Sequence, residues 1–160
     1  MNILKFGGTS VGSVASIRTL LDIVGRDTEA SGERPVVVLS AMSGVTNLLL
    51  RAAEDAAQGQ PVAPHLRELE ARHFEMVKAL LDAARQNPVL TRLKLLLHEL
   101  EDLLQGIGSL RELSPATRDR VLSYGERCSA FMVSCLAAVR FPEALFVDAT
   151  ELICTDAHFG

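Results

Sequence analysis

The first part of the chain passes from a short apolar run to a glycine turn and then to a stretch in which apolar residues have helical spacing. The run at 3–6 ends at Gly7-Gly8, and apolar residues then recur three or four positions apart. This pattern predicts a strand, a turn and an amphipathic helix, and the hydroxyl of Thr9 or Ser10 is suited to capping that helix.

The same order of patterns returns further along the chain. A β-branched run at 36–39 leads into small residues at 40–44 and then into an apolar stretch from 45 to 57. Two strand–turn–helix units in succession predict a parallel sheet with helices on its faces. The expected fold class is therefore α/β.

The middle of the chain shows two stretches with helical spacing of apolar residues and no strand pattern. Across about 62–110, apolar positions advance by three or four residues on either side of Asn87-Pro88. Because proline interrupts a helix, this pattern predicts an antiparallel helical hairpin that turns at 87–88 and is inserted into the α/β unit.

A further helix is expected after the hairpin. Ser114-Pro115 predicts its start, because Ser is favoured at a helix cap and Pro at the first helical position, and the helix is expected to close near Pro142. A third strand is expected at 144–147, followed by a fourth strand or a turn at 151–154.

Composition and charge narrow the class of protein. The 160 residues carry 16 Lys and Arg against 20 Asp and Glu, a net charge of −4, so no nucleic-acid partner is expected. Three sparse cysteines (Cys128, Cys135 and Cys154) fit reduced thiols, and four histidines without ligand-like spacing predict no metal site. No apolar segment approaches the length of a membrane span, so we expect a soluble, cytoplasmic domain with no membrane partner.

The turn at Gly7-Gly8 is the strongest candidate for chemistry. Paired glycines before a helix let backbone N–H groups approach an anion, and Lys5 adds a full positive charge. The segment is neither a P-loop, since Ser13-Val14 stands where Lys and Ser/Thr are needed, nor a GxGxxG turn. By these local features, a phosphate cradle and a turn shaped only for β–α packing both remain open.

Four segments taken together resemble the aspartate kinases of the amino acid kinase superfamily. They are KFGGTSVG at 5–12, VVLSAMSGVTNLL at 37–49, SYGER at 123–127, and the stretch from VDA at 147–149 to TDAHFG at 155–160. They occur in the family's order across essentially the whole chain. The resemblance implies an open parallel-sheet α/β/α sandwich, of which these residues form part.

The same resemblance implies that much of the family's catalytic domain lies outside residues 1–160. No GRGGSD segment occurs in the chain. The 160 residues are therefore expected to be the N-terminal part of the domain, inactive alone, without its C-terminal nucleotide half or any ACT regulatory domain.

The activity implied by the resemblance is transfer of a phosphoryl group from ATP, bound with Mg²⁺, to the β-carboxylate of L-aspartate. The product is 4-phospho-L-aspartate, the first step towards lysine, threonine and methionine. No tightly bound cofactor is implied, and a homo-oligomer is expected for the full-length enzyme.

Eight residues are assigned by matching the family's motifs. Lys5 would stabilise charge on the transferring phosphoryl group, with Gly7, Gly8, Thr9 and Ser10 around the ATP phosphates and Ser40, Thr46 and Glu126 around aspartate. Each has a structural alternative: a surface lysine, hydroxyls that cap helices, and a solvated helix carboxylate. Gly125 lowers helix propensity beside Glu126, which suits a close approach of another group.

Two other functions stay open from the sequence. One is another amino acid kinase, acting on glutamate, acetylglutamate, carbamate or UMP, which would share the glycine turn. The other is a non-catalytic chain that binds a partner or ligand, which the absence of a second half favours.

Overall fold

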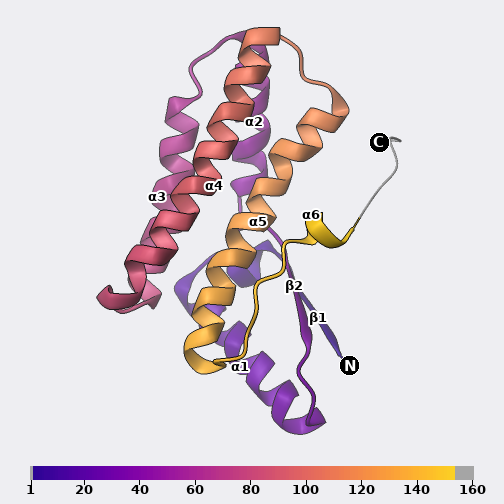
Figure 1. Ribbon diagram of the computed structural model, residues 1–160, viewed down its shortest axis with the longest axis vertical. Helices are drawn as coiled ribbons and strands as arrows, with labels where there is room; N and C mark the ends of the chain where they lie inside the picture. Colours follow the sequence, from indigo (N-terminus) through magenta and orange to yellow (C-terminus); the bar gives the residue numbers. More distant parts are fainter. Residues whose placement is uncertain (1, 154–160) are drawn as a thin grey trace.

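The computed structural model describes residues 2–153, which form a two-stranded parallel sheet and a larger helical part (Figure 1). Strand β1 (Ile3–Phe6) pairs with β2 (Val36–Leu39), in a register that sets Phe6 opposite Leu39. Helix α1 (Val14–Ser31) forms the crossover that parallel strands require. The predicted α/β class and parallel pairing are confirmed.

The first helix begins later than its candidate caps suggested. Gly8–Val11 forms a short 3-10 turn (η1), and Ser13 caps α1 by accepting a hydrogen bond from the Ser16 amide at 3.1 Å. The Ser16 hydroxyl in turn accepts from the Ser13 amide at 3.1 Å, which completes a reciprocal capping box. The expectation that Thr9 or Ser10 caps this helix is therefore wrong.

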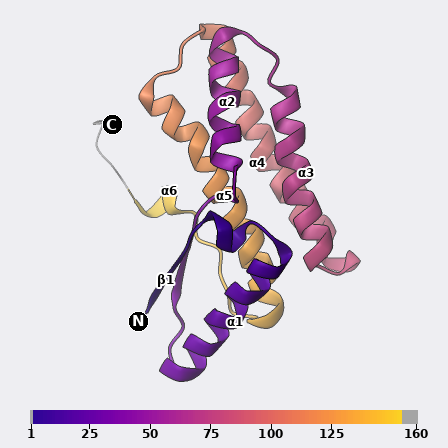
Figure 2. The same cartoon turned by 180° about the vertical axis from the view of Figure 1, so that it is seen from behind.

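Four helices pack lengthwise into a bundle, called the helical layer below, which extends beyond the carboxyl ends of the two strands, as Figure 1 and Figure 2 show from opposite sides. They are α2 (Val45–Gln58), α3 (Ala63–Leu80), α4 (Ala83–Leu110) and α5 (Pro115–Arg140). Helix α5 runs on past this layer to reach the sheet and α1. The layer's apolar stripes supply most of the fully buried side chains of the core.

The antiparallel hairpin of α3 and α4 is confirmed, but its predicted turn is wrong. The chain turns at Leu81-Asp82, where Asp82 caps α4 by accepting from the Arg85 amide at 3.2 Å. Pro88 lies inside α4. Both Pro88 and Ala84 are exposed, so the loss of the hydrogen bond between them falls on the outer side of α4, and the helix continues.

The segment after α5 does not form the predicted third strand. Residues 144–147 carry no strand, and the Phe146 ring packs edge-on against Phe131 of α5 with centroids 5.6 Å apart. Asp148 then caps the single-turn helix α6 (Ala149–Leu152) by accepting from the Thr150 amide at 3.1 Å. These contacts direct the segment to α5 and away from the sheet. Cys154 and TDAHFG lie outside the described residues.

The two faces of the sheet have different surroundings. Leu4, Phe6, Val37 and Leu39 pack against the core, whereas Ile3, Val36 and Val38 on the other face are 65%, 45% and 45% exposed. Within residues 2–153, no helix is long and apolar enough to cross a membrane.

Candidate functional site

The two sequence motifs at the strand ends lie side by side. The Ser40 amide donates to the Phe6 carbonyl at 3.1 Å and the Ser43 amide donates to the Gly8 carbonyl at 3.2 Å. These bonds join the turn after β1 to the turn after β2 at the carboxyl edge of the sheet. Ligands of open α/β sheets bind at this edge.

The paired glycines have different roles in the first turn. A Cβ on Gly8 would lie 2.8 Å from the Ala41 carbonyl oxygen, so only glycine allows this approach of the two turns. A Cβ on Gly7 would meet nothing within 4 Å. Gly8 therefore serves packing, and the space above Gly7 is open to a ligand. Thr9 is exposed and Ser10 is half-buried, and neither side chain caps a helix.

Ser40 and Thr46 keep their hydroxyl groups uncommitted. Helix α2 is capped by Gly44, which has the left-handed φ of 79° and no side-chain hydrogen bond, so neither hydroxyl serves as its cap. Thr46 is exposed in the first turn of α2 and Ser40 is half-buried. Neither hydroxyl has a hydrogen-bond partner in the part of the chain that the structure describes.

Helix α5 brings Glu126 to the same end of the sheet. A Cβ on Gly125 would lie 2.7 Å from the Ala41 Cβ, so the group that approaches this glycine is the turn after β2. The Glu126 carboxylate is half-buried and forms no ion pair or hydrogen bond with another described residue. The carboxylate is therefore available to a cation beside the strand ends.

Lys5 occupies the other side of the sheet from the packed helices. It alternates with Leu4 and Phe6, and it lies opposite Val38 on the exposed face. Its ammonium group has no acidic partner among residues 2–153. The structure thus groups Gly7, Gly8, Ser40 and Glu126 around the strand ends, with Lys5 on the exposed face just before them.

An ion pair beside Glu126 is not predicted by the sequence. Arg127 Nε donates to Asp148 Oδ2 at 2.9 Å, and its guanidinium lies 4.8 Å from the Tyr124 ring centroid. Burial by itself raises the pKa of Asp148, but hydrogen bonds from Thr150 and Arg127 outweigh it and hold that pKa below its ordinary value. The pair fastens the segment after α5 to α5. Arg127 and Asp148 are 21 residues apart, so no local sequence pattern predicts this ion pair.

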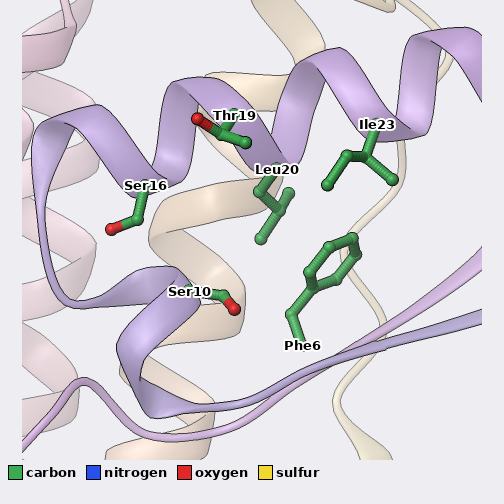
Figure 3. A pocket seen from close by; sticks show the side chains of 6 residues that line it. All are labelled: Phe6, Ser10, Ser16, Thr19, Leu20 and Ile23. Carbon is green, nitrogen blue, oxygen red and sulfur yellow. The ribbon is translucent and has the colours of Figure 1, made fainter.

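Two hollows adjoin the site. A pocket of about 150 Å³ lies between β1, η1 and α1, with the Phe6 ring directed towards Ile23 and Leu20 (Figure 3). A groove of about 340 Å³ lies between the turn after β2 and α3. There Arg72 Nη1 donates to the Ser43 carbonyl at 3.3 Å, so the hairpin braces the turn that leads into α2.

The described residues hold no group of three or more His, Cys, Asp or Glu arranged to bind a metal ion. Cys128 is buried on α5, and burial raises the pKa of its thiol to about 12, so it stays protonated and packs as a small apolar residue. His73 is also buried and belongs to the helical layer.

Residues 1–157 match the amino acid kinase family, and the chain belongs to that family. It is 37% identical to aspartokinase 1, chloroplastic, of Arabidopsis thaliana, over 96% of this chain and 26% of that protein. It is 31% identical to lysine-sensitive aspartokinase 3 of Escherichia coli strain K12, over 99% of this chain and 33% of that protein.

A solved structure shares the fold. Escherichia coli aspartokinase III in complex with aspartate and ADP matches with a TM-score of 0.74 and 28% identity, over 88% of this chain and 29% of that chain. The chain thus spans only about a quarter to a third of the length of the relatives it matches.

Proposed function

We propose that these residues are part of an aspartate kinase and supply its aspartate site and its phosphate turn. One observation carries the proposal: the turn at Gly7-Gly8 and the turn after β2 are hydrogen-bonded to each other at the carboxyl ends of parallel strands. Their similarity to proteins named aspartokinases supports the choice of aspartate, as does the complex of one relative with aspartate and ADP.

In the proposed reaction, a β-carboxylate oxygen of L-aspartate attacks the γ-phosphorus of MgATP. The bond from that phosphorus to the bridging oxygen breaks, ADP leaves, and 4-phospho-L-aspartate forms with no covalent enzyme intermediate. Catalysis of phosphoryl transfer rests on positioning and electrostatics. Lys5 would stabilise the charge on the phosphoryl oxygens, and the open amide of Gly7 would donate to a phosphate.

The aspartate substrate would lie between the turn after β2 and α5. The uncommitted hydroxyls of Ser40 and Thr46 are suited to its carboxylates, and the uncommitted Glu126 carboxylate is suited to its ammonium group. Gly8, Thr9 and Ser10 would complete the phosphate turn. Opposite charges on substrate and protein then fix which end of the amino acid faces ATP.

We also propose that the whole domain is an α/β/α sandwich, of which residues 1–160 are the N-terminal part with an inserted hairpin at about 62–110. The exposed face of the sheet supports this, because parallel sheets are covered on both faces. The nucleotide half and any ACT domains would lie outside these residues. A cytoplasmic location and a homo-oligomeric enzyme stay predictions.

A hydroxamate assay with L-aspartate, MgATP and hydroxylamine tests the function. The full-length protein should form aspartyl hydroxamate, and the 160-residue chain should be folded by circular dichroism but inactive. Phosphorylation of glutamate, acetylglutamate, carbamate or UMP with aspartate inert would contradict the proposal. A full-length protein inert with all of them would favour a non-catalytic binding chain.

The role of Glu126 is tested by Glu126→Ala in the full-length protein. Loss of a charged partner should raise the KM for aspartate at least about tenfold, with the KM for ATP changed far less. Glu70→Ala is a matched control, because Glu70 is also a half-buried helix carboxylate, on α3. Equal effects on both KM values would refute the assigned role.

A further inference from the structure

The buried hydroxyl of Ser129 connects two candidate substrate residues. Ser129 follows Glu126 by about one turn of α5, is 0% exposed, and donates from Oγ to the Ser40 carbonyl oxygen at 2.6 Å. The Glu126 carbonyl oxygen lies 3.2 Å from the same Oγ. One hydroxyl therefore lies between the backbone of Ser40 and the backbone of Glu126.

This hydrogen bond differs from those of the neighbouring serines. Ser123 Oγ donates to the Arg120 carbonyl at 2.7 Å and Ser134 Oγ donates to the Phe131 carbonyl at 2.7 Å, both within α5. Ser129 reaches out of its helix to a residue 89 positions away. Its bond fixes one element against another, which bonds within a helix do not.

The packing beside Ser129 leaves little freedom. A Cβ on Gly125 would lie 2.7 Å from the Ala41 Cβ and 3.3 Å from a Val45 methyl group, so α5 lies against this turn as closely as glycine permits. Close packing fixes how near α5 comes to the turn, but it does not fix the position of α5 along its own axis. The hydrogen bond from Ser129 to Ser40 is directional and sets the register of α5 along the strand end.

We propose that Ser129 is a positioning residue for aspartate binding, which holds the Ser40 hydroxyl and the Glu126 carboxylate at a fixed separation. The inference rests on the proposed function. Ser129 itself touches no substrate, because its oxygen is buried and engaged by the backbone. Without its hydroxyl, the Ser40 carbonyl loses this buried donor and α5 shifts, which misplaces the partner of the substrate ammonium.

The test uses Ser129→Ala in the full-length protein, with Ser134→Ala as the matched control. We expect the KM for aspartate to rise on the order of tenfold in Ser129→Ala, with less than about a twofold change in the KM for ATP. The control should leave both constants unchanged. A parallel rise in both KM values, or none, would overturn the inference. If Ser129→Ala does not fold, Ser129→Cys keeps the volume and a weak donor and should give a smaller selective rise.

A double-mutant cycle separates action through Glu126 from a general loss of order. In a Glu126→Ala background, the added Ser129→Ala change should raise the KM for aspartate much less than it does alone. Full additivity would contradict the proposed route. If the full-length protein without substitutions shows no aspartate-dependent turnover, the proposed function and this inference are both overturned. If it turns over aspartate and Ser129→Ala has an unaltered KM for aspartate, this inference alone is overturned.

Discussion

The helical layer and the sheet use similar apolar residues in opposite surroundings. In the layer, Leu48, Leu93 and Leu100 are almost completely buried by neighbouring helices. In the sheet, Ile3 and Val36 on the outer face are 65% and 45% exposed. An apolar pattern therefore predicts an element and its inward face, but it does not predict which other element covers that face. The helical layer encloses its own core, and the sheet leaves the apolar side chains of one face exposed among residues 2–153.

The largest effect is expected in the helical layer. Leu100 is 0% exposed on α4 and Leu95 on the same helix is 50% exposed. Leu100→Ala should lower the free energy of unfolding by about 2–5 kcal/mol, because it leaves a cavity. Leu95→Ala, the control, should cost less than about 1 kcal/mol. Urea denaturation of the 160-residue chain measures both, and similar costs would mean that the layer does not close its core as described.

The contact between the two regions is tested at Gly125. Gly125→Ala should destabilise by about 1–3 kcal/mol, since the new methyl group meets Ala41, Leu49 and Val45. Gly106→Ala on α4 is its counterpart, because a Cβ there meets nothing within 4 Å. That change should stabilise by about 0.5–1 kcal/mol through helix propensity. Thermal unfolding distinguishes them, and a stabilising Gly125→Ala would refute the close approach of α5 to the turn.

A smaller, pH-dependent effect is expected from His73. Its Nδ1 donates to the Leu69 carbonyl at 2.7 Å, its buried Nε2 has no partner among the described residues, and burial holds its pKa below 6.5. Below pH 6.5 the unfolded chain gains a proton that the folded chain does not, so stability present at pH 7 falls by about 1.4 kcal/mol per pH unit until the folded pKa is passed.

His73→Leu should remove this part of the pH dependence without loss of stability at pH 7, measured by urea denaturation at pH 7 and pH 5. The exposed His98 provides the control, and His98→Gln should keep the dependence. An identical pH dependence in His73→Leu would show that other groups cause it.

The smallest effect on stability is expected on the exposed sheet face. Val38→Thr keeps the shape and β propensity of the side chain while adding a hydroxyl where water already reaches. The free energy of unfolding should change by less than about 0.5 kcal/mol, and the solubility of the 160-residue chain should rise. A loss of several kcal/mol would mean that this face is covered within the 160-residue chain.

Sequence predicted the elements whose pattern is local and left out the contacts that join them. The strands at 3–6 and 36–39 and the start of α5 at Ser114-Pro115 were predictable from periodicity and capping. The sequence predicts the turn of the hairpin at the wrong place, because proline usually interrupts a helix, whereas Pro88 lies exposed inside α4 and the helix continues. The expected strand at 144–147 failed because Phe131 and Arg127, both on α5, anchor that segment.

In the candidate site too, the sequence predicts residues that belong to local motifs but not the contacts between elements. Its glycine turn and its Ser40, Thr46 and Glu126 were identified through motifs, and their roles stay predictions. The sequence does not predict the role of Ser129, because nothing near a serine within a helix indicates that its hydroxyl bonds to another element. The purpose of Gly125 also required the structure, which shows Ala41 as the group that approaches it.

The hydrogen bond from Ser129 to Ser40 has a consequence for synthesis on the ribosome. The turn at Gly7-Gly8 is made among the first residues, and the turn that begins at Ser40 follows it. Helix α5, which fixes that second turn, emerges from the exit tunnel only after Ser129 has been translated and has cleared it. The turn that begins at Ser40 therefore gains its hydrogen bond from Ser129 only after α5 has been translated, long after the turn itself has been made.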